Sequence, residues 1–169
     1  MRFFIDDLLR YAHATHADRQ VTALDGEALL QKALIALDEA VVSSGAKISH
    51  DPLPTVTADA GIEYVLQNLI SNAIKYHRER VVPEIHISAR EDADSWVFSV
   101  ADNGIGIDSR NQEKIFGIFC RLHGSDIPGN GIGLALSQKI IQAHQGAIWV
   151  ESEPGAGSKF FFTLPKHAD

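Results

Sequence analysis

Two asparagines and a lysine recur at helical spacing in the middle of the chain. Asn68, Asn72 and Lys75 stand at offsets of 0, 4 and 7 residues, which at ~100° per residue brings them within about 60° of one another on a helix. Asparagine is a poor residue for a helix interior. A solvated helix face would explain the pattern. The alternative is a set of oxygen ligands for a hard cation, with the lysine placed to meet phosphate oxygens.

Two glycine-rich segments carry the other candidate chemistry. The run Asp102-Asn-Gly-Ile-Gly-Ile-Asp108 follows a segment rich in β-formers, so its first carboxylate stands at a strand end beside backbone that a ligand can approach. A simple turn capped by an Asx side chain is the alternative. The run Gly129-Asn-Gly-Ile-Gly133 opens a predicted helix, where backbone amides can bind phosphate. It fits neither the P-loop nor the dinucleotide-binding pattern.

Taken together, the three patterns supply a metal ligand, an acceptor for a base and a cradle for phosphates. They therefore predict a magnesium–nucleotide site. The elements that must position it follow from hydrophobic periodicity and turn residues. We expect helices over residues 3–17, 25–44, 59–76 and 133–144, and strands over residues 84–89, 96–100, 147–151 and 159–164.

Several boundaries of these elements have local signals. Asp25 and Asp59 are predicted N-caps, and Gly45 is expected to end the second helix. Short strand candidates flank Pro52 and Pro54, a linker is predicted from His13 to Thr22, and regular structure is expected to fail between residues 102 and 133. The order of elements is not strictly alternating, so it predicts an α+β fold with a mixed sheet and helices on one face.

Composition limits the function. The chain has 169 residues and a formal net charge of −7, which suits one domain with a short appendage and argues against a nucleic-acid binder. No apolar run approaches the ~18–20 residues that span a bilayer, so no direct membrane contact is expected. The single Cys120 suits a reducing compartment.

Four motifs and a closing hairpin follow one another along the chain. The motifs are Gln67-Asn-Leu-Ile-Ser-Asn-Ala-Ile-Lys-Tyr76, Asp102–Ile107, Ile115-Phe-Gly-Ile-Phe-Cys-Arg-Leu-His123 and Gly129–Leu136, and the hairpin covers Gly146–Ser158 and Phe160–Pro165. Over about residues 24–165 they resemble, in this order, the N box, first glycine box, F box, second glycine box and closing hairpin of sensor histidine kinases. The form Phe-x-x-Phe-x-Arg-Leu-His most resembles the phytochrome-like branch.

The resemblance implies a two-layer α/β sandwich of the Bergerat type, with a mixed, mostly antiparallel sheet, that binds ATP with Mg²⁺. By motif position, Asn72 would coordinate Mg²⁺ with support from Asn68, and Lys75 would contact phosphate. Asp102 would accept a hydrogen bond from the adenine amino group. Tyr76 would pack near the adenine or serve as a core aromatic.

The glycine boxes and the segment between them complete the implied site. Gly104 and Gly106 would leave room for the nucleotide, and Gly131 and Gly133 would approach the phosphates. Residues 108–130 would form a mobile lid. Phe116 and Phe119 would anchor this lid, and Arg121 would reach phosphate or a partner surface, or stay solvated. The implied nucleotide-binding set also includes Ile107, Gly129 and Leu134.

One position bears on the reaction. Gyrase-like and mismatch-repair members of the superfamily carry a glutamate four residues before the metal-binding asparagine, where it activates water. This chain has Asn68 there, and an amide is a poor general base, so phosphoryl transfer is favoured over hydrolysis.

The expected acceptor is a histidine on a separate dimerisation domain. Its motif, His-Asp/Glu-x-x-x-Pro, does not occur in the chain. Residues 1–20 instead resemble the end of the second hairpin helix and a linker, and residues 21–169 the ATP-binding domain. We therefore expect a cytoplasmic kinase domain that is incomplete alone, works with a response regulator receiver domain, and belongs to a homodimeric full-length protein. The alternatives are a nucleotide-binding regulatory module and an anti-sigma-type serine kinase.

Overall fold

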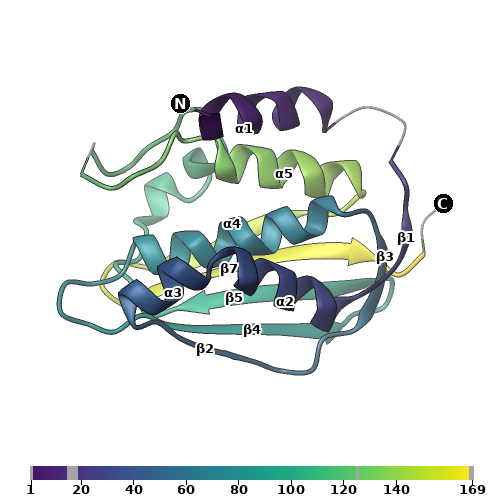
Figure 1. Cartoon of the computed structure of the whole chain (residues 1–169), viewed down its shortest axis with the longest axis horizontal. Coiled ribbons are helices and arrows are strands. Elements are labelled where there is room, and N and C mark those ends of the chain that lie inside the picture. The colour runs from purple at the N-terminus through teal and green to yellow at the C-terminus, as the bar shows by residue number, and fades with distance from the viewer. Residues whose placement is uncertain (1, 15–18, 125, 168–169) are drawn as a thin grey trace.

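The computed structural model describes residues 2–14, 19–124 and 126–167, with side chains from residue 5 onward. Helices and strands alternate irregularly along these residues (Figure 1). In chain order the elements are α1 (Arg2–His13), β1 (Thr22–Asp25), α2 (Gly26–Ala36), α3 (Asp38–Ser44), β2 (Lys47–His50), β3 (Thr55–Ala58), α4 (Gly61–Lys75), β4 (Glu84–Glu91), β5 (Ser95–Asp102), the short 3₁₀ turns η1 (Ser109–Asn111) and η2 (Lys114–Phe116), α5 (Gly133–Ala143), β6 (Ile148–Glu153) and β7 (Gly157–Pro165).

A five-stranded sheet forms one layer, in the order β2-β4-β5-β7-β6. The β2–β4 pair is parallel and the other three pairs are antiparallel. Strands β1 and β3 form a separate antiparallel pair. Helices α2, α4 and α5 lie across one face of the sheet (Figure 1). The predicted mixed, mostly antiparallel sheet with helices on one face is confirmed.

The core lies between this sheet and helix α4. Alternate residues of β7 are buried, and the Phe162 ring stacks on the Phe98 ring of β5 with centroids 5.0 Å apart. Phe161, which lies between the buried Phe160 and Phe162 on β7, points to the opposite face of the sheet, where it stacks on Trp149. The face of α4 that meets the sheet is apolar at helical spacing, and its buried residues are Ile62, Val65, Leu66, Leu69, Ile70, Ala73 and Ile74.

The predicted helix over residues 25–44 was wrong in one respect, because it is two helices. The chain leaves α-helical geometry at Leu37, whose φ and ψ are −103° and 8°. Leu37 remains buried, so the break redirects the chain while its side chain still contributes to the core. The predicted ends are confirmed, since Asp25 accepts a hydrogen bond from the Glu27 amide and Gly45 adopts a left-handed conformation.

The boundaries of the other helices differ by a few residues from the prediction. Helix α4 begins at Gly61, and Asp59 still satisfies its first turn by accepting a hydrogen bond from the Gly61 amide at 2.8 Å. Helix α1 ends at His13. Part of the predicted end of this helix and of the following linker, residues 15–18, lies outside the described residues.

The segment between the glycine boxes packs on the core through one phenylalanine rather than two. Phe116 is buried, and its ring meets the Phe160 ring edge-on at 6.4 Å. Phe119 is 55% exposed, so the prediction that it anchors the lid was wrong. Its backbone has a φ of 61° and donates a hydrogen bond to the Gly131 carbonyl, which ties this part of the segment to the second glycine box. Ile115 is buried beside Phe116 in its place.

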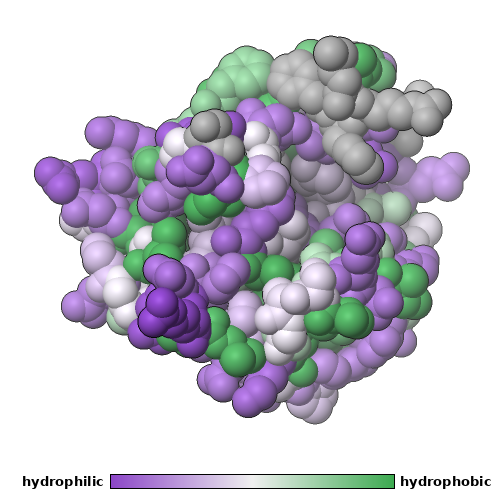
Figure 2. All heavy atoms as spheres, turned by 60° about the vertical axis from the view of Figure 1, so that its left-hand side comes forward, coloured by the Kyte–Doolittle hydropathy of each residue, from purple (hydrophilic) through white to green (hydrophobic). Residues whose placement is uncertain are grey.

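The surface shows no large apolar area on the face drawn in Figure 2, where hydrophobic and hydrophilic residues are interspersed among the coloured atoms. Within the described part of the chain, no helix combines the length and the apolar character needed to cross a bilayer.

The stacked pair in the core generates a stability prediction. Phe162→Ala removes a fully buried ring and leaves a cavity, so the free energy of unfolding should fall by about 3–5 kcal/mol. Denaturant unfolding followed by circular dichroism measures the change. The control is Ile35→Ala, because Ile35 is 75% exposed and should change stability by less than about 0.5 kcal/mol. Equal losses in the two variants would contradict this description of the core.

Candidate nucleotide-binding site

A single cavity of about 480 Å³ gathers the predicted site residues. It lies between α4, the lid segment and the ends of β5 and β7. Every predicted site residue except Gly104 lines it, which places together side chains and backbone from four separate sequence motifs. The predicted residues in its lining are Asn68, Asn72, Lys75, Tyr76, Asp102, Gly106, Ile107, Arg121, Gly129, Gly131, Gly133 and Leu134.

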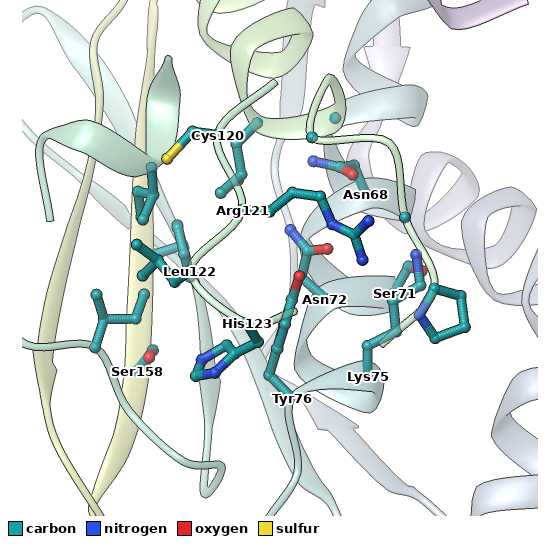
Figure 3. A pocket seen from close by; sticks show the side chains of 18 of the residues that line it. Asn68, Ser71, Asn72, Lys75, Tyr76, Cys120, Arg121, Leu122, His123 and Ser158 are labelled. Carbon is teal, nitrogen blue, oxygen red and sulfur yellow. The ribbon is translucent and has the colours of Figure 1, made fainter. Parts of the chain in front are cut away.

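Helix α4 presents its polar stripe to this cavity because its apolar stripe is buried in the core. Asn72 and Lys75 point into the cavity from successive turns (Figure 3). The Asn68 amide donates a hydrogen bond to Ser137 Oγ of α5 at 3.1 Å, so the bond fixes the nitrogen and leaves the oxygen as the available ligand atom. Burial lowers the pKa of Lys75, and the nearby Asp7 carboxylate partly offsets this effect.

These donors suit a hard cation beside a phosphate chain. Amide oxygens are ligands that Mg²⁺ accepts, and Mg²⁺ is commonly held by few protein atoms together with phosphates and water. Lysine supplies a point charge for phosphate oxygens. The residues present therefore fit a magnesium–phosphate group.

The carboxylate of Asp102 stands at the end of β5, deep in the cavity. Its Oδ1 accepts hydrogen bonds from the Gly104 and Ser158 amides at 2.8 and 3.2 Å. Burial raises the pKa of Asp102, and these two amide donors partly counteract the rise. Since one oxygen is fixed by backbone, the other is oriented as an acceptor for a ligand amino group.

The glycines around the cavity are needed by the protein's own packing. A Cβ at Gly106, which has a φ of 73°, would lie 2.0 Å from the Glu153 carbonyl oxygen. A Cβ at Gly104 would lie 2.4 Å from the Tyr76 carbonyl oxygen. At the start of α5, a Cβ on Gly133 would lie 2.3 Å from Asn68 Oδ1. The glycine boxes thus allow loop and helix backbone to pack directly against the ligand-bearing elements.

Arg121 and His123 of the lid face α4 across the cavity (Figure 3). The Arg121 guanidinium donates hydrogen bonds to the carbonyls of Gly124 and Ile127, which ties it to the lid backbone. The His123 ring lies against the Tyr76 ring with centroids 5.7 Å apart. Burial raises the pKa of Tyr76, and Arg121 partly lowers it.

Sequence reasoning missed several residues that line the cavity. Among them, Asp7 lies farthest along the chain from the four motifs. Asp7 belongs to α1, and its carboxylate accepts hydrogen bonds from the Tyr64 hydroxyl at 3.4 Å and from the Asn130 amide at 3.1 Å. No local pattern could have found it, because both partners lie far away in the sequence. Ser158 was found only as part of the closing-hairpin motif, without a role.

Comparison with known proteins agrees with this geometry. Residues 57–168 match the family model for "Histidine kinase-, DNA gyrase B-, and HSP90-like ATPase". The chain belongs to this ATPase family. It is 47% identical over 167 residues to "Cyanobacterial phytochrome A" of Nostoc sp. strain PCC 7120. The aligned region covers 98% of this chain and 22% of that relative. The chain thus spans about a fifth of the length of this curated relative.

Solved structures of histidine kinases share the fold. Full-length ShkA in complex with AMPPNP matches with a TM-score of 0.83 at 28% identity, over 98% of this chain and 36% of that one. Histidine kinase ThkA in complex with response regulator protein TrrA matches with a TM-score of 0.76 at 26% identity, over 98% of this chain and 47% of that one. The Bergerat-type sandwich expected for this family of ATP-binding domains is therefore confirmed.

The buried carboxylate generates a pH prediction. The raised pKa of Asp102 means that the folded state binds its proton more tightly than the unfolded state does. Its contribution to stability is therefore present at acidic pH and is lost as pH rises through the folded-state pKa. The Asn side chain in Asp102→Asn cannot lose a proton. The stability of this variant relative to the parent should therefore increase as pH rises from the ordinary pKa of aspartate, about 3.9, through the raised pKa of Asp102 in the folded state.

Denaturant unfolding of both proteins at a series of pH values from about 3.5 to 7 measures the difference. The control is Asp94→Asn at an exposed position, for which the difference from the parent should stay nearly flat. A flat difference for Asp102→Asn as well would show that burial does not perturb this carboxyl group.

Proposed function

We propose that the chain is the ATP-binding catalytic domain of a histidine kinase, formed by residues 21–169, with residues 1–20 as the end of a dimerisation helix and a linker. It binds Mg²⁺-ATP and directs the γ-phosphoryl group to a histidine on a separate dimerisation domain. A response regulator receiver domain then takes the phosphoryl group, in the cytoplasm. The response regulator bound to ThkA in the related structure supports this partner.

One observation carries the proposal. Asn68, Asn72 and Lys75 line the same cavity as Asp102. The side chains suited to a metal and phosphates therefore face the same ligand as the carboxylate suited to an adenine amino group. The cavity is also of the size that small-molecule ligands occupy. The AMPPNP bound to ShkA supports an adenine nucleotide as that ligand.

Each of these residues has a separate role in the proposed reaction. Asp102 accepts the hydrogen bond from the base, and Lys75 attracts the phosphates. Asn72, with support from Asn68, would hold Mg²⁺, which supplies neutralisation of phosphate charge when bound. Positioning and charge stabilisation account for most of phosphoryl-transfer catalysis.

The side chain at position 68 favours transfer over hydrolysis. An amide cannot take a proton from water at neutral pH, and Asn68 is already bonded to Ser137 and packed against Gly133. The γ-phosphoryl group is therefore kept for an acceptor that brings its own nucleophile.

Labelled ATP tests the proposal directly. The chain is incubated with Mg²⁺, γ-labelled ATP and a helical hairpin bearing an acceptor histidine, and the label on the hairpin is then analysed. Phosphohistidine is labile in acid and stable in base, and label of that kind on the hairpin is the expected result. Acid-stable, base-labile label would instead indicate a serine kinase. Binding of ATP without any transfer would indicate a regulatory module.

The metal assignment has its own test. Asn72→Ala removes the proposed Mg²⁺ ligand, so the gain in ATP affinity on adding Mg²⁺ should fall by roughly 10-fold or more. Isothermal titration with and without Mg²⁺ measures the gain. The matched control is Asn111→Ala in η1, outside the cavity lining, which should keep the full gain. An unchanged gain in Asn72→Ala would refute the assignment.

A further inference from the structure

The contacts of two serines near Asp102 can all be satisfied at once with only one direction of hydrogen bonding. Ser152 Oγ donates to the Gly157 carbonyl at 2.8 Å and accepts from the Ile107 amide at 2.7 Å. A carbonyl can only accept, so this bond uses the single hydroxyl proton of Ser152. The Ser158 Oγ lies 2.8 Å from Ser152 Oγ, and only the Ser158 hydroxyl is left to supply the proton for that bond.

The consequence appears at the cavity wall. Ser158 is buried but lines the cavity, whereas Ser152 does not. Because the Ser158 proton points back to Ser152, its oxygen offers only lone pairs to a ligand. The Ser158 amide donates to Asp102 Oδ1, so the acceptor-only hydroxyl stands on the residue next to the base-reading carboxylate. Figure 3 shows the Ser158 side chain at the strand wall of the cavity.

We propose that Ser152 is a positioning residue for base selection, which keeps the Ser158 hydroxyl an acceptor so that this end of the cavity favours a 6-amino purine over a 6-oxo purine. An amino group donates to both acceptors, while an oxo group meets lone pairs and leaves buried groups unpaired. This inference rests on the proposed nucleotide function and deepens it.

The test compares the affinities of ATP and ITP, which differ at position 6 of the purine and also at N1, where the 6-oxo base carries a proton, so the readout is the change in preference between variants. Ser152→Ala frees the Ser158 proton to turn into the cavity and donate to the oxo group, so the preference for ATP over ITP should fall by roughly 3- to 10-fold, the worth of one net hydrogen bond. Loss of the acceptor for the Ile107 amide should weaken both nucleotides alike. Ser152→Thr retains the hydroxyl and should keep the parental preference.

A double-mutant cycle separates positioning from a general structural role. In a Ser158→Ala background, Ser152→Ala should no longer change the preference, because the group through which it acts is gone. The single variant Ser158→Ala, which removes the acceptor, should itself lower the preference and keeps the inference testable if Ser152→Ala fails to fold. An unchanged preference in the single variants, or an equal effect of Ser152→Ala in both backgrounds, would overturn the inference. Failure of the parent to bind either nucleotide would instead count against the proposed function.

A second inference follows from an independent feature, the position of α1. This helix packs along α5, where Lys139 Nζ donates to the Tyr11 carbonyl at 2.8 Å and lies 4.1 Å from the centre of the Tyr11 ring. On the side facing α4, the Arg10 guanidinium lies over the Tyr64 ring at 5.6 Å. These contacts hold Asp7 at the cavity, where Tyr64 and Asn130 donate to its two oxygens.

The negative charge of Asp7 acts on the part of the cavity where the phosphates are expected to bind. Asp7 lines the cavity together with Lys75. Burial lowers the pKa of Lys75, and the charge of Asp7 partly offsets that effect. A triphosphate would bring further negative charge to the same region. We infer that the docked position of α1 and the loading of Mg²⁺-ATP oppose each other through Asp7. By thermodynamic linkage, each should weaken the other by the same factor. This inference also rests on the proposed function.

The neighbouring residue provides a matched control. Asp7→Asn and Asp6→Asn remove the same charge from the same helix, but Asp6 is exposed and outside the cavity lining. Asp7→Asn should raise the affinity for Mg²⁺-ATP by roughly 3- to 10-fold at low salt, less at high salt, and leave the affinity for adenosine unchanged. Asp6→Asn should change neither.

Two outcomes would overturn this second inference. Equal gains in both variants would show an effect of net charge alone. A loss of Mg²⁺-ATP affinity in Asp7→Asn would show that the carboxylate helps to hold the ligand. If the parent does not bind Mg²⁺-ATP, the proposed function fails first and separately.

Discussion

Burial of one face of α4 against the sheet is the constraint on which the site depends. The apolar stripe from Ile62 to Ile74 is almost completely buried, and this fixes the rotation of the helix about its axis. Helical geometry then leaves no choice for the opposite stripe. Asn68, Asn72 and Lys75 must face the cavity as a consequence of core packing, so the metal-binding and phosphate-binding groups need no separate device to orient them.

The base end of the cavity relies instead on backbone packed against backbone. The Gly106 loop lies against the end of β6, where a Cβ on Gly106 would lie 2.0 Å from the Glu153 carbonyl oxygen. Two successive hydrogen bonds then connect β6 to the carboxylate. One joins the hydroxyls of Ser152 and Ser158, and the other runs from the Ser158 amide to Asp102. The two ends of the site thus differ in kind. One is set by the rotation of a helix, and the other by a network of hydrogen bonds among backbone amides, two serines and the carboxylate.

Much of this arrangement was predictable from the sequence, for a physical reason. The α4 stripe, the carboxylate at the end of β5 and the glycine-opened α5 each depend on periods or spacings within a short segment. Three features were not predictable. The break at Leu37 has no glycine or proline to mark it, the exposure of Phe119 accompanies a backbone bond to Gly131, and the position of Asp7 depends on partners 57 and 123 residues away. Local patterns carry no information about such contacts.

The stacking of Trp149 on Phe161 has a practical consequence. Phe161 faces away from the helical layer, between two core residues of β7, so Trp149 is held on the far side of the sheet from the cavity. The other tryptophan, Trp96, packs at the margin of the core, and neither is among the lining residues. Intrinsic indole emission should therefore report the integrity of the sheet and remain silent to ligand occupancy. Unfolding can then be followed by this emission in the presence of nucleotide without interference from loading of the cavity.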